Sequence, residues 1–193
     1  YYANKADCLR VMGSKGTTEH DFQQLYPETE YKIYAIGIDE LTGEFNTEVI
    51  FSEVITTPAK GVSEAYIEVT FDKYFDGSAL AQKYPQEFGD ATGYAVVPLK
   101  VTKHGDVAQF WYDVYSDDLS DTTYPTDLDL IIDLQINGIA NKEYTYAYCD
   151  YSTILTLASF CKDSEDNDSA VTRNVFRVLD SGVSPVDEFE FFE

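Results

Sequence analysis

Short runs of β-forming residues recur along this chain, and turn-forming residues separate them. Two such runs, residues 31–38 and 49–56, flank an acidic turn that ends at Gly43, where a positive φ is easily adopted. Aromatic and β-branched residues favour pleated, half-buried surfaces, and short strands with turns between them are typical of a β-sandwich. We therefore predict an all-β fold. Six further runs have the same character: residues 65–71, 93–102, 107–115, 143–149, 153–161 and 170–178.

A break in the pattern near residue 58 predicts two domains. Pro58 cannot donate to a central ladder, so residues 57–61 are interpreted as a linker. The chain has 193 residues, which is enough for one large or two small domains. A strand followed by Asp-x-x-x-Gly or Asp-x-x-x-Asn occurs on both sides of the linker, as in a weak repeat. We expect domains at residues 1–59 and 64–193, the second one larger.

The segment at residues 126–137 allows two interpretations. Its apolar residues alternate as they would in a strand. However, Thr126 suits a helix N-cap with Asp129 three residues later, and Gly138 suits the C-terminal end. We favour a short helix near residues 126–137, inserted in the second domain.

Leu25, Pro27, Thr29 and Tyr31 stand at alternate positions where the chain enters the first predicted strand. Their spacing resembles the entry to strand F of fibronectin type III domains. The resemblance implies a tyrosine corner, in which the tyrosine hydroxyl bonds a backbone group a few residues upstream. It also implies that Tyr31, Ile33 and Ala35 face a core.

The second half resembles such a domain less closely. Residues 159–169 are similar to the hairpin that follows strand F, but Leu155 stands where the corner tyrosine belongs. Overall the chain resembles the tandem fibronectin type III or immunoglobulin-like β-sandwich modules of bacterial cell-surface lipoproteins. The resemblance implies an extracellular or outer-membrane location and a non-catalytic role in adhesion, protein–protein contact or spacing.

Fewer residues precede Tyr31 than such a domain places before its corner. Without the missing strands the inner face of the first domain would be open, and exposed apolar side chains are costly. We therefore expect that the native polypeptide extends upstream of Tyr1 or that another chain covers this face.

The net charge of −22 narrows the choice of partners. A strongly acidic surface repels phosphate backbones, which argues against nucleic-acid binding. No run of 18 apolar residues is present, so we expect no transmembrane segment in this chain. The remaining partner is an unknown protein or glycan at the cell surface.

Enzymatic and metal-binding motifs are absent from the sequence. Cys8, Cys149 and Cys161 include no CxxC pair, so we expect buried thiols or, alternatively, one Cys149–Cys161 bridge. His20 is not placed to form a nucleophilic pair with Cys8. The acidic loop at residues 161–169 offers oxygen ligands for Ca²⁺ but lacks an EF-hand pattern, and we interpret it as a solvated turn. We expect no enzyme activity, no cofactor and no metal.

One strand offers candidate ligand-binding residues. Tyr144, Tyr146 and Tyr148 alternate along residues 143–149 and share one face. An exposed tyrosine ladder can stack on sugar rings or anchor a protein. The competing interpretation is that the tyrosines pack inward or under the inserted helix. The alternative functions are therefore a carbohydrate-binding module or an accessory domain of a secreted glycan-degrading enzyme.

Overall fold

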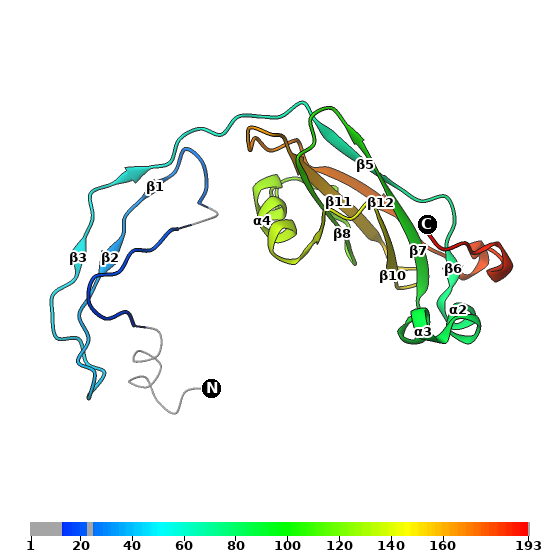
Figure 1. Ribbon diagram of the computed structural model, residues 1–193, viewed down its shortest axis with the longest axis horizontal. Helices are drawn as coiled ribbons and strands as arrows, with labels where there is room; N and C mark the ends of the chain where they lie inside the picture. The colour runs from blue at the N-terminus through cyan, green and yellow to red at the C-terminus, as the bar shows by residue number, and fades with distance from the viewer. Residues whose placement is uncertain (1–12, 23–24, 193) are drawn as a thin grey trace. The chain divides into compact units, whose positions relative to one another are not determined.

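The computed structural model describes residues 13–22 and 25–192, and the chain divides into two compact units (Figure 1). The first unit comprises residues 1–60 and the second residues 61–193. The division falls within the linker that the sequence indicates. Each unit is described below by itself.

The first unit contains an interrupted antiparallel hairpin. Strand β1 (Glu30–Tyr31) pairs with β4 (Ile55–Thr56), and β2 (Tyr34–Ala35) pairs with β3 (Ile50–Phe51). Between the two ladders the Ile33 amide donates to the Ser52 hydroxyl, at 3.0 Å, instead of to a carbonyl. This side-chain bond replaces a backbone bond and explains why two short strand pairs stand where longer strands are expected.

The acidic turn of this hairpin is closed by one carboxylate. Asp39 Oδ1 accepts hydrogen bonds from the amides of Leu41 and Thr42, each at 2.9 Å. The Thr42 amide, followed by the Leu41 amide, lowers the pKa of Asp39. Gly43 has a φ of 71° and donates its amide to the Asp39 carbonyl at 2.8 Å. The local sequence thus determines this turn without help from a packed core.

The second unit contains two four-stranded antiparallel sheets. The first sheet has the order β10-β7-β5, and β6 also pairs with β7. The second sheet has the order β12-β11-β8-β9. The strands of the first sheet are β5 (Tyr66–Thr70), β6 (Phe75–Asp76), β7 (Ala95–His104) and β10 (Tyr144–Cys149). The strands of the second sheet are β8 (Gln109–Tyr115), β9 (Ile139–Ala140), β11 (Leu155–Lys162) and β12 (Thr172–Phe176). Six of these strands, all except β6 and β9, overlap the runs that the sequence indicates.

Both sheets contribute side chains to one buried cluster. Alternate residues of β7, including Val97 and Leu99, meet Phe110 and Tyr112 of β8 there. The Tyr112 hydroxyl donates to the Lys142 carbonyl at 2.9 Å, so this buried polar group is satisfied. The structure thus confirms that the fold consists mostly of β-strands, and the second unit also contains short helices.

Helix α4 (Asp127–Asn137) occupies the segment in which the sequence allows either a strand or a helix, so the predicted helix is confirmed. Thr126 and Asp129 form a capping box, in which the Asp129 amide donates to Thr126 Oγ1 and the Thr126 amide donates to Asp129 Oδ2. Leu130 and Leu134 are buried against Phe160 of β11. The helix therefore covers the outer face of the second sheet.

Two further helices, which the sequence pattern does not indicate, cover part of the first sheet. Helices α2 (Gly77–Lys83) and α3 (Pro85–Phe88) are followed by the short turn η1 (Gly89–Ala91). Asp76 caps α2 by accepting from the Ala79 amide at 2.7 Å. The short turns η2 (Asp180–Gly182) and η3 (Val186–Glu188) complete the unit.

Candidate functional site

The three candidate tyrosines lie on the outer face of the first sheet. Tyr146 and Tyr148 of β10 pair with Pro98 and Val96 of β7. Val96 belongs to the cluster under α2 and α3, whereas Cys149, from the opposite face of β10, belongs to the core between the sheets. The tyrosines therefore point away from that core, and α4 does not cover them because it packs on β8 and β11.

The tyrosine ladder is open at its ends and covered in its middle. Tyr144 and Tyr148 each retain 42% of their exposure. Tyr146 is half-buried because Phe189 and Phe192 lie on it, with ring centroids 5.6 and 5.0 Å away. A ligand could reach both ends of the ladder but not the whole of it.

Tyr148 has a second ring beside it. Its centroid lies 6.5 Å from that of Tyr94, and the two ring planes differ by only 21°. Tyr94 is 40% exposed and follows the turn at Gly93, where φ is 89°. Burial, and then the charge of Asp90, raise the pKa of Tyr148, so its hydroxyl stays protonated and able to donate at neutral pH. Two nearly parallel exposed rings next to a carboxylate form a candidate contact surface. Tyr94 is absent from the sequence-based candidates because it precedes a different strand.

The tyrosine of the proposed corner makes a hydrogen bond to upstream backbone. The Tyr26 amide donates to the Tyr31 hydroxyl at 2.7 Å. Thr29 Oγ1 donates to the Pro27 carbonyl at 2.9 Å, and Thr57 Oγ1 donates to the Tyr26 carbonyl at 2.5 Å. These bonds tie the entry of β1 to the end of β4.

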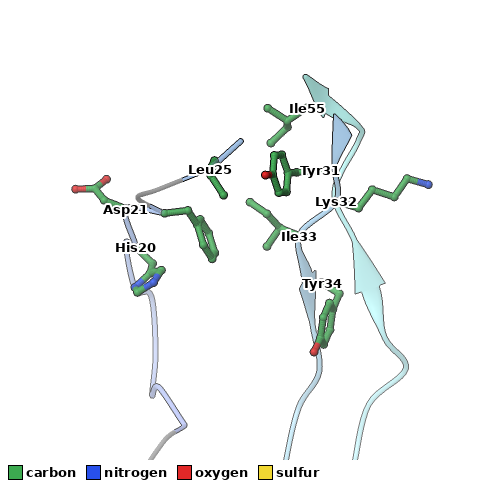
Figure 2. A pocket seen from close by; sticks show the side chains of 9 residues that line it. His20, Asp21, Leu25, Tyr31, Lys32, Ile33, Tyr34 and Ile55 are labelled. Carbon is green, nitrogen blue, oxygen red and sulfur yellow. The ribbon is translucent and has the colours of Figure 1, made fainter. Parts of the chain in front are cut away.

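Next to this corner lies an open apolar groove of about 660 Å³ (Figure 2). Tyr31, Ile33 and Ile55 point into it from the hairpin, while Leu25, His20 and Asp21 lie on the opposite side. Ile33 and Ile55 are 40% and 49% exposed, so apolar surface remains in contact with solvent. This is the face that the sequence leads us to expect to be covered by further polypeptide.

The acidic loop binds its own backbone. Asp163 Oδ1 accepts from the amides of Glu165 and Asn167, at 3.0 and 2.9 Å. Burial by itself would raise the pKa of Asp163. The hydrogen bonds, led by the one from the Asn167 amide, outweigh burial and lower this pKa. Lys162 pairs with Asp166 at 2.7 Å. Within residues 13–22 and 25–192, no group of three or more His, Cys, Asp or Glu side chains could hold a metal ion.

The two cysteines that the structure describes are separate, buried thiols. Cys149 and Cys161 do not form the alternative bridge. Burial, and then Asp150, raise the pKa of Cys149 to about 12, and burial is also the main cause that raises the pKa of Cys161. Neither is an activated nucleophile, which would need a lowered pKa. Cys8 lies outside the described residues.

A polar cluster under α4 is not among the candidate sites that the sequence indicates. The Tyr115 hydroxyl donates to Asp133 Oδ2 at 2.6 Å, and Asn137 Nδ2 donates to Asp133 Oδ1 at 2.8 Å. Asp113 is half-buried, and burial is the main cause that raises its pKa, with the Asp133 charge adding to it. Residues from β8 and α4 meet here only in three dimensions, so no sequence spacing could indicate the contact.

Comparisons with known proteins identify no family for this chain. No family model matches the chain, and neither a curated protein nor a solved structure does. Among the residues that the structure describes, no helix is long and apolar enough to cross a membrane. The class that the structure itself defines is a β-rich protein of two units, with exposed aromatic and apolar surfaces on each.

Proposed function

We propose that this chain is a non-catalytic module of the bacterial cell surface, built from tandem fibronectin type III-like or immunoglobulin-like β-sandwiches, that serves adhesion, protein–protein contact or spacing. The hydrogen bond from the Tyr26 amide to the Tyr31 hydroxyl, and the two facing sheets of the second unit, support the fold assignment. The acidic charge supports solubility and argues against nucleic acid as the partner.

The observation that favours protein contact is the apolar groove of the first unit. Monomeric proteins rarely leave contiguous apolar surface in water, and such surface marks interaction sites when polar groups surround it. The residues that line the groove are mostly apolar or aromatic, and the charged side chains among them, Asp21 and Lys32, point away from it toward solvent. Covering each large apolar side chain would contribute about 1.5–3 kcal/mol.

A test compares binding of the intact chain and a groove variant to a panel of immobilised extracellular-matrix proteins. The variant carries Ile33→Ser and Ile55→Ser, and the matched control carries Ile136→Ser, on α4, where the side chain is 61% exposed. We expect the groove variant to lose at least about tenfold in affinity while the control keeps it. Equal binding by all three proteins would reject the groove as the contact site.

The second candidate function is carbohydrate binding, as an independent module or as an accessory domain of a secreted glycan-degrading enzyme. The exposed pair Tyr94 and Tyr148, together with Tyr144, supports it. A glycan array should then show a signal that Tyr94→Ala and Tyr148→Ala each remove. Tyr124→Ala is the control, because that side chain is 82% exposed and lies elsewhere. An array without a hit would leave only the protein-contact proposal.

A further inference from the structure

One short segment covers the middle of the tyrosine ladder through its aromatic side chains. Residues 186–192, with the sequence VDEFEFF, are called the aromatic segment below. In Figure 1 this red part of the chain lies beside α2 and β6. Phe189 is only 5% exposed, and its ring centroid lies 5.2 Å from those of Phe75 and Phe88, with the ring planes nearly perpendicular. Such edge-to-face contacts define a pocket for one phenylalanine.

The two following phenylalanines occupy neighbouring positions on the same surface. Phe191 contacts Tyr84, with centroids 5.1 Å apart. Phe192 lies over Tyr144 and Tyr146, at 4.8 and 5.0 Å, and its amide donates to the Tyr146 hydroxyl at 3.2 Å. The surface therefore accommodates several aromatic side chains from one extended stretch.

Two lysines complement the acidic residues of the aromatic segment. Lys83 Nζ lies 2.7 Å from Asp187 Oδ1, and Lys73 Nζ lies 2.7 Å from Glu188 Oε2. Exposed ion pairs contribute little free energy. They nevertheless place positive charge at the border of an aromatic surface in a chain with only 13 basic residues against 35 acidic ones. This charge selects for an acidic occupant.

The aromatic segment is held by side chains more than by backbone. The amides of Glu188 and Phe189 donate to Pro185 and Val186, within the same short turn. In the part of the chain that the structure describes, no strand ladder includes residues 186–192. Segments without ladder bonds open locally at a lower free energy than strands of a core sheet. The segment can leave its surface without breaking a sheet ladder, and the cost of leaving is the exposure of the buried Phe189 ring, which a partner phenylalanine in the same place would offset.

We propose that the surface formed by α2, α3 and β10 is a peptide-binding groove for an acidic segment with phenylalanines spaced as Phe189, Phe191 and Phe192 are, and that residues 186–192 occupy it in cis. A partner peptide of this chemistry displaces the aromatic segment, and the displacement uncovers Tyr146. Occupation in cis lowers the apparent affinity for the partner. The groove is distinct from the apolar groove of the first unit, so its failure would leave the proposed protein-contact function intact.

The test uses a fluorescently labelled peptide with the sequence of residues 185–192 and the full chain. The host variant carries Phe189→Ala, Phe191→Ala and Phe192→Ala, which empties the groove but keeps its walls. We expect fluorescence anisotropy to show binding to this variant, and binding at least about tenfold weaker to the unmodified chain, where the cis segment competes. A peptide with alanine in place of Phe189 should bind to neither.

Charge variants sharpen this test. Adding Lys73→Gln and Lys83→Gln to the host variant should weaken peptide binding. Lys32→Gln with Lys162→Gln, which removes the same charge elsewhere, should not. Absence of binding to the folded host variant would overturn the proposal, and so would equal binding to the host variant and the unmodified chain.

A measurement on the unmodified chain keeps the proposal testable even if the host variant does not fold. Hydrogen exchange should be at least about 100-fold faster at the amides of Glu188, Phe189 and Phe192 than at the β7 and β10 ladder amides, because the segment opens locally. Exchange of those three amides at the rate of the ladders would show that residues 186–192 are a fixed part of the fold, and the proposal would be rejected.

Discussion

The Tyr26 amide donates a hydrogen bond to the hydroxyl of Tyr31, five residues later, and the two atoms lie 2.7 Å apart. The bond returns the chain onto itself just before β1, while Thr57 Oγ1 accepts from the Thr29 amide at 3.0 Å. Together they join the two ends of the hairpin. Among the described residues of this unit most large apolar side chains are exposed, so polar contacts of this kind contribute to its stability.

The first prediction concerns this bond. Tyr31→Phe removes the acceptor and should cost about 0.5–1.5 kcal/mol, because the freed Tyr26 amide is exposed and regains water. Hydrogen exchange at the Ser52 and Thr57 amides, which donate to Ile33 and Thr29, should become about 2–10-fold faster. Tyr34→Phe is the control, since that side chain is 68% exposed. Equal exchange in both variants would contradict a structural role for the Tyr31 hydroxyl.

The second prediction concerns the start of α4. Thr126→Ala removes the side-chain acceptor of the Asp129 amide and breaks the capping box. Loss of such a cap should cost about 0.5–2 kcal/mol. Thermal unfolding of the second unit should show a lower Tm, whereas Thr102→Ala, at an exposed strand position, should change it little. An unchanged Tm for Thr126→Ala would mean that packing of Leu130 and Leu134 alone holds the helix.

Local signals explain which parts of the fold the sequence could indicate. Strands β5, β7, β8 and β11 were indicated by their own composition, and α4 by the capping residues at Thr126 and Asp129, which outweighed a strand-like alternation. Helix α2 was missed because seven residues, Gly77–Lys83, are too few to show a helical period. The shared face of Tyr144, Tyr146 and Tyr148 follows from strand geometry.

The covering of that face could not be predicted. It depends on Phe189 and Phe192, more than forty residues from Tyr146 in sequence. Tyr94 joins Tyr148 in the same way, through strand register and not through a motif. Long-range packing of this kind leaves no signal in one sequence.

The third prediction concerns Arg173. Its guanidinium donates to the carbonyls of Leu119, Asp121 and Pro125 and to Asp127 Oδ1, and its side chain is only 5% exposed. Lysine cannot reproduce this planar fork, so Arg173→Lys should cost about 1.5–3 kcal/mol and loosen the loop that precedes α4. Urea unfolding measures the loss. Arg177→Lys, at an exposed position, should be close to neutral, and equal midpoints for the two variants would refute the role of Arg173.

The fourth prediction concerns the buried thiols. The pKa of Cys149 is raised to about 12 by burial, so almost no thiolate forms at pH 8. Incubation of the folded chain with iodoacetamide should leave the peptides that contain Cys149 and Cys161 unmodified, as read by mass spectrometry. The same peptides should be alkylated after denaturation in urea. Rapid alkylation of Cys149 in the folded chain would show that the core between the sheets opens readily.

The last prediction uses the polar cluster under α4. Burial raises the pKa of Asp113 above the value of 3.8 of a free aspartate, while the Val114 amide, at 2.8 Å, partly offsets the shift. The folded chain therefore binds this proton more tightly than the unfolded chain does. The contribution of Asp113 to stability is greatest below pH 3.8 and is lost as the pH rises through the folded-state pKa.

Asp113→Asn removes the buried charge and keeps an oxygen that can accept from Val114. We therefore expect a higher Tm than that of the unmodified chain at pH 7 and a smaller difference as the pH falls toward 3.8. The other groups around this position, Tyr115 and Asp133, are unchanged in the variant. Asp118→Asn is a control of opposite sign, because the Ser120 hydroxyl and amide lower the pKa of Asp118, and asparagine there should not raise the Tm. Differential scanning calorimetry at several pH values measures both variants. An advantage of Asp113→Asn that grows as the pH falls would contradict a buried, charge-disfavouring site beneath α4.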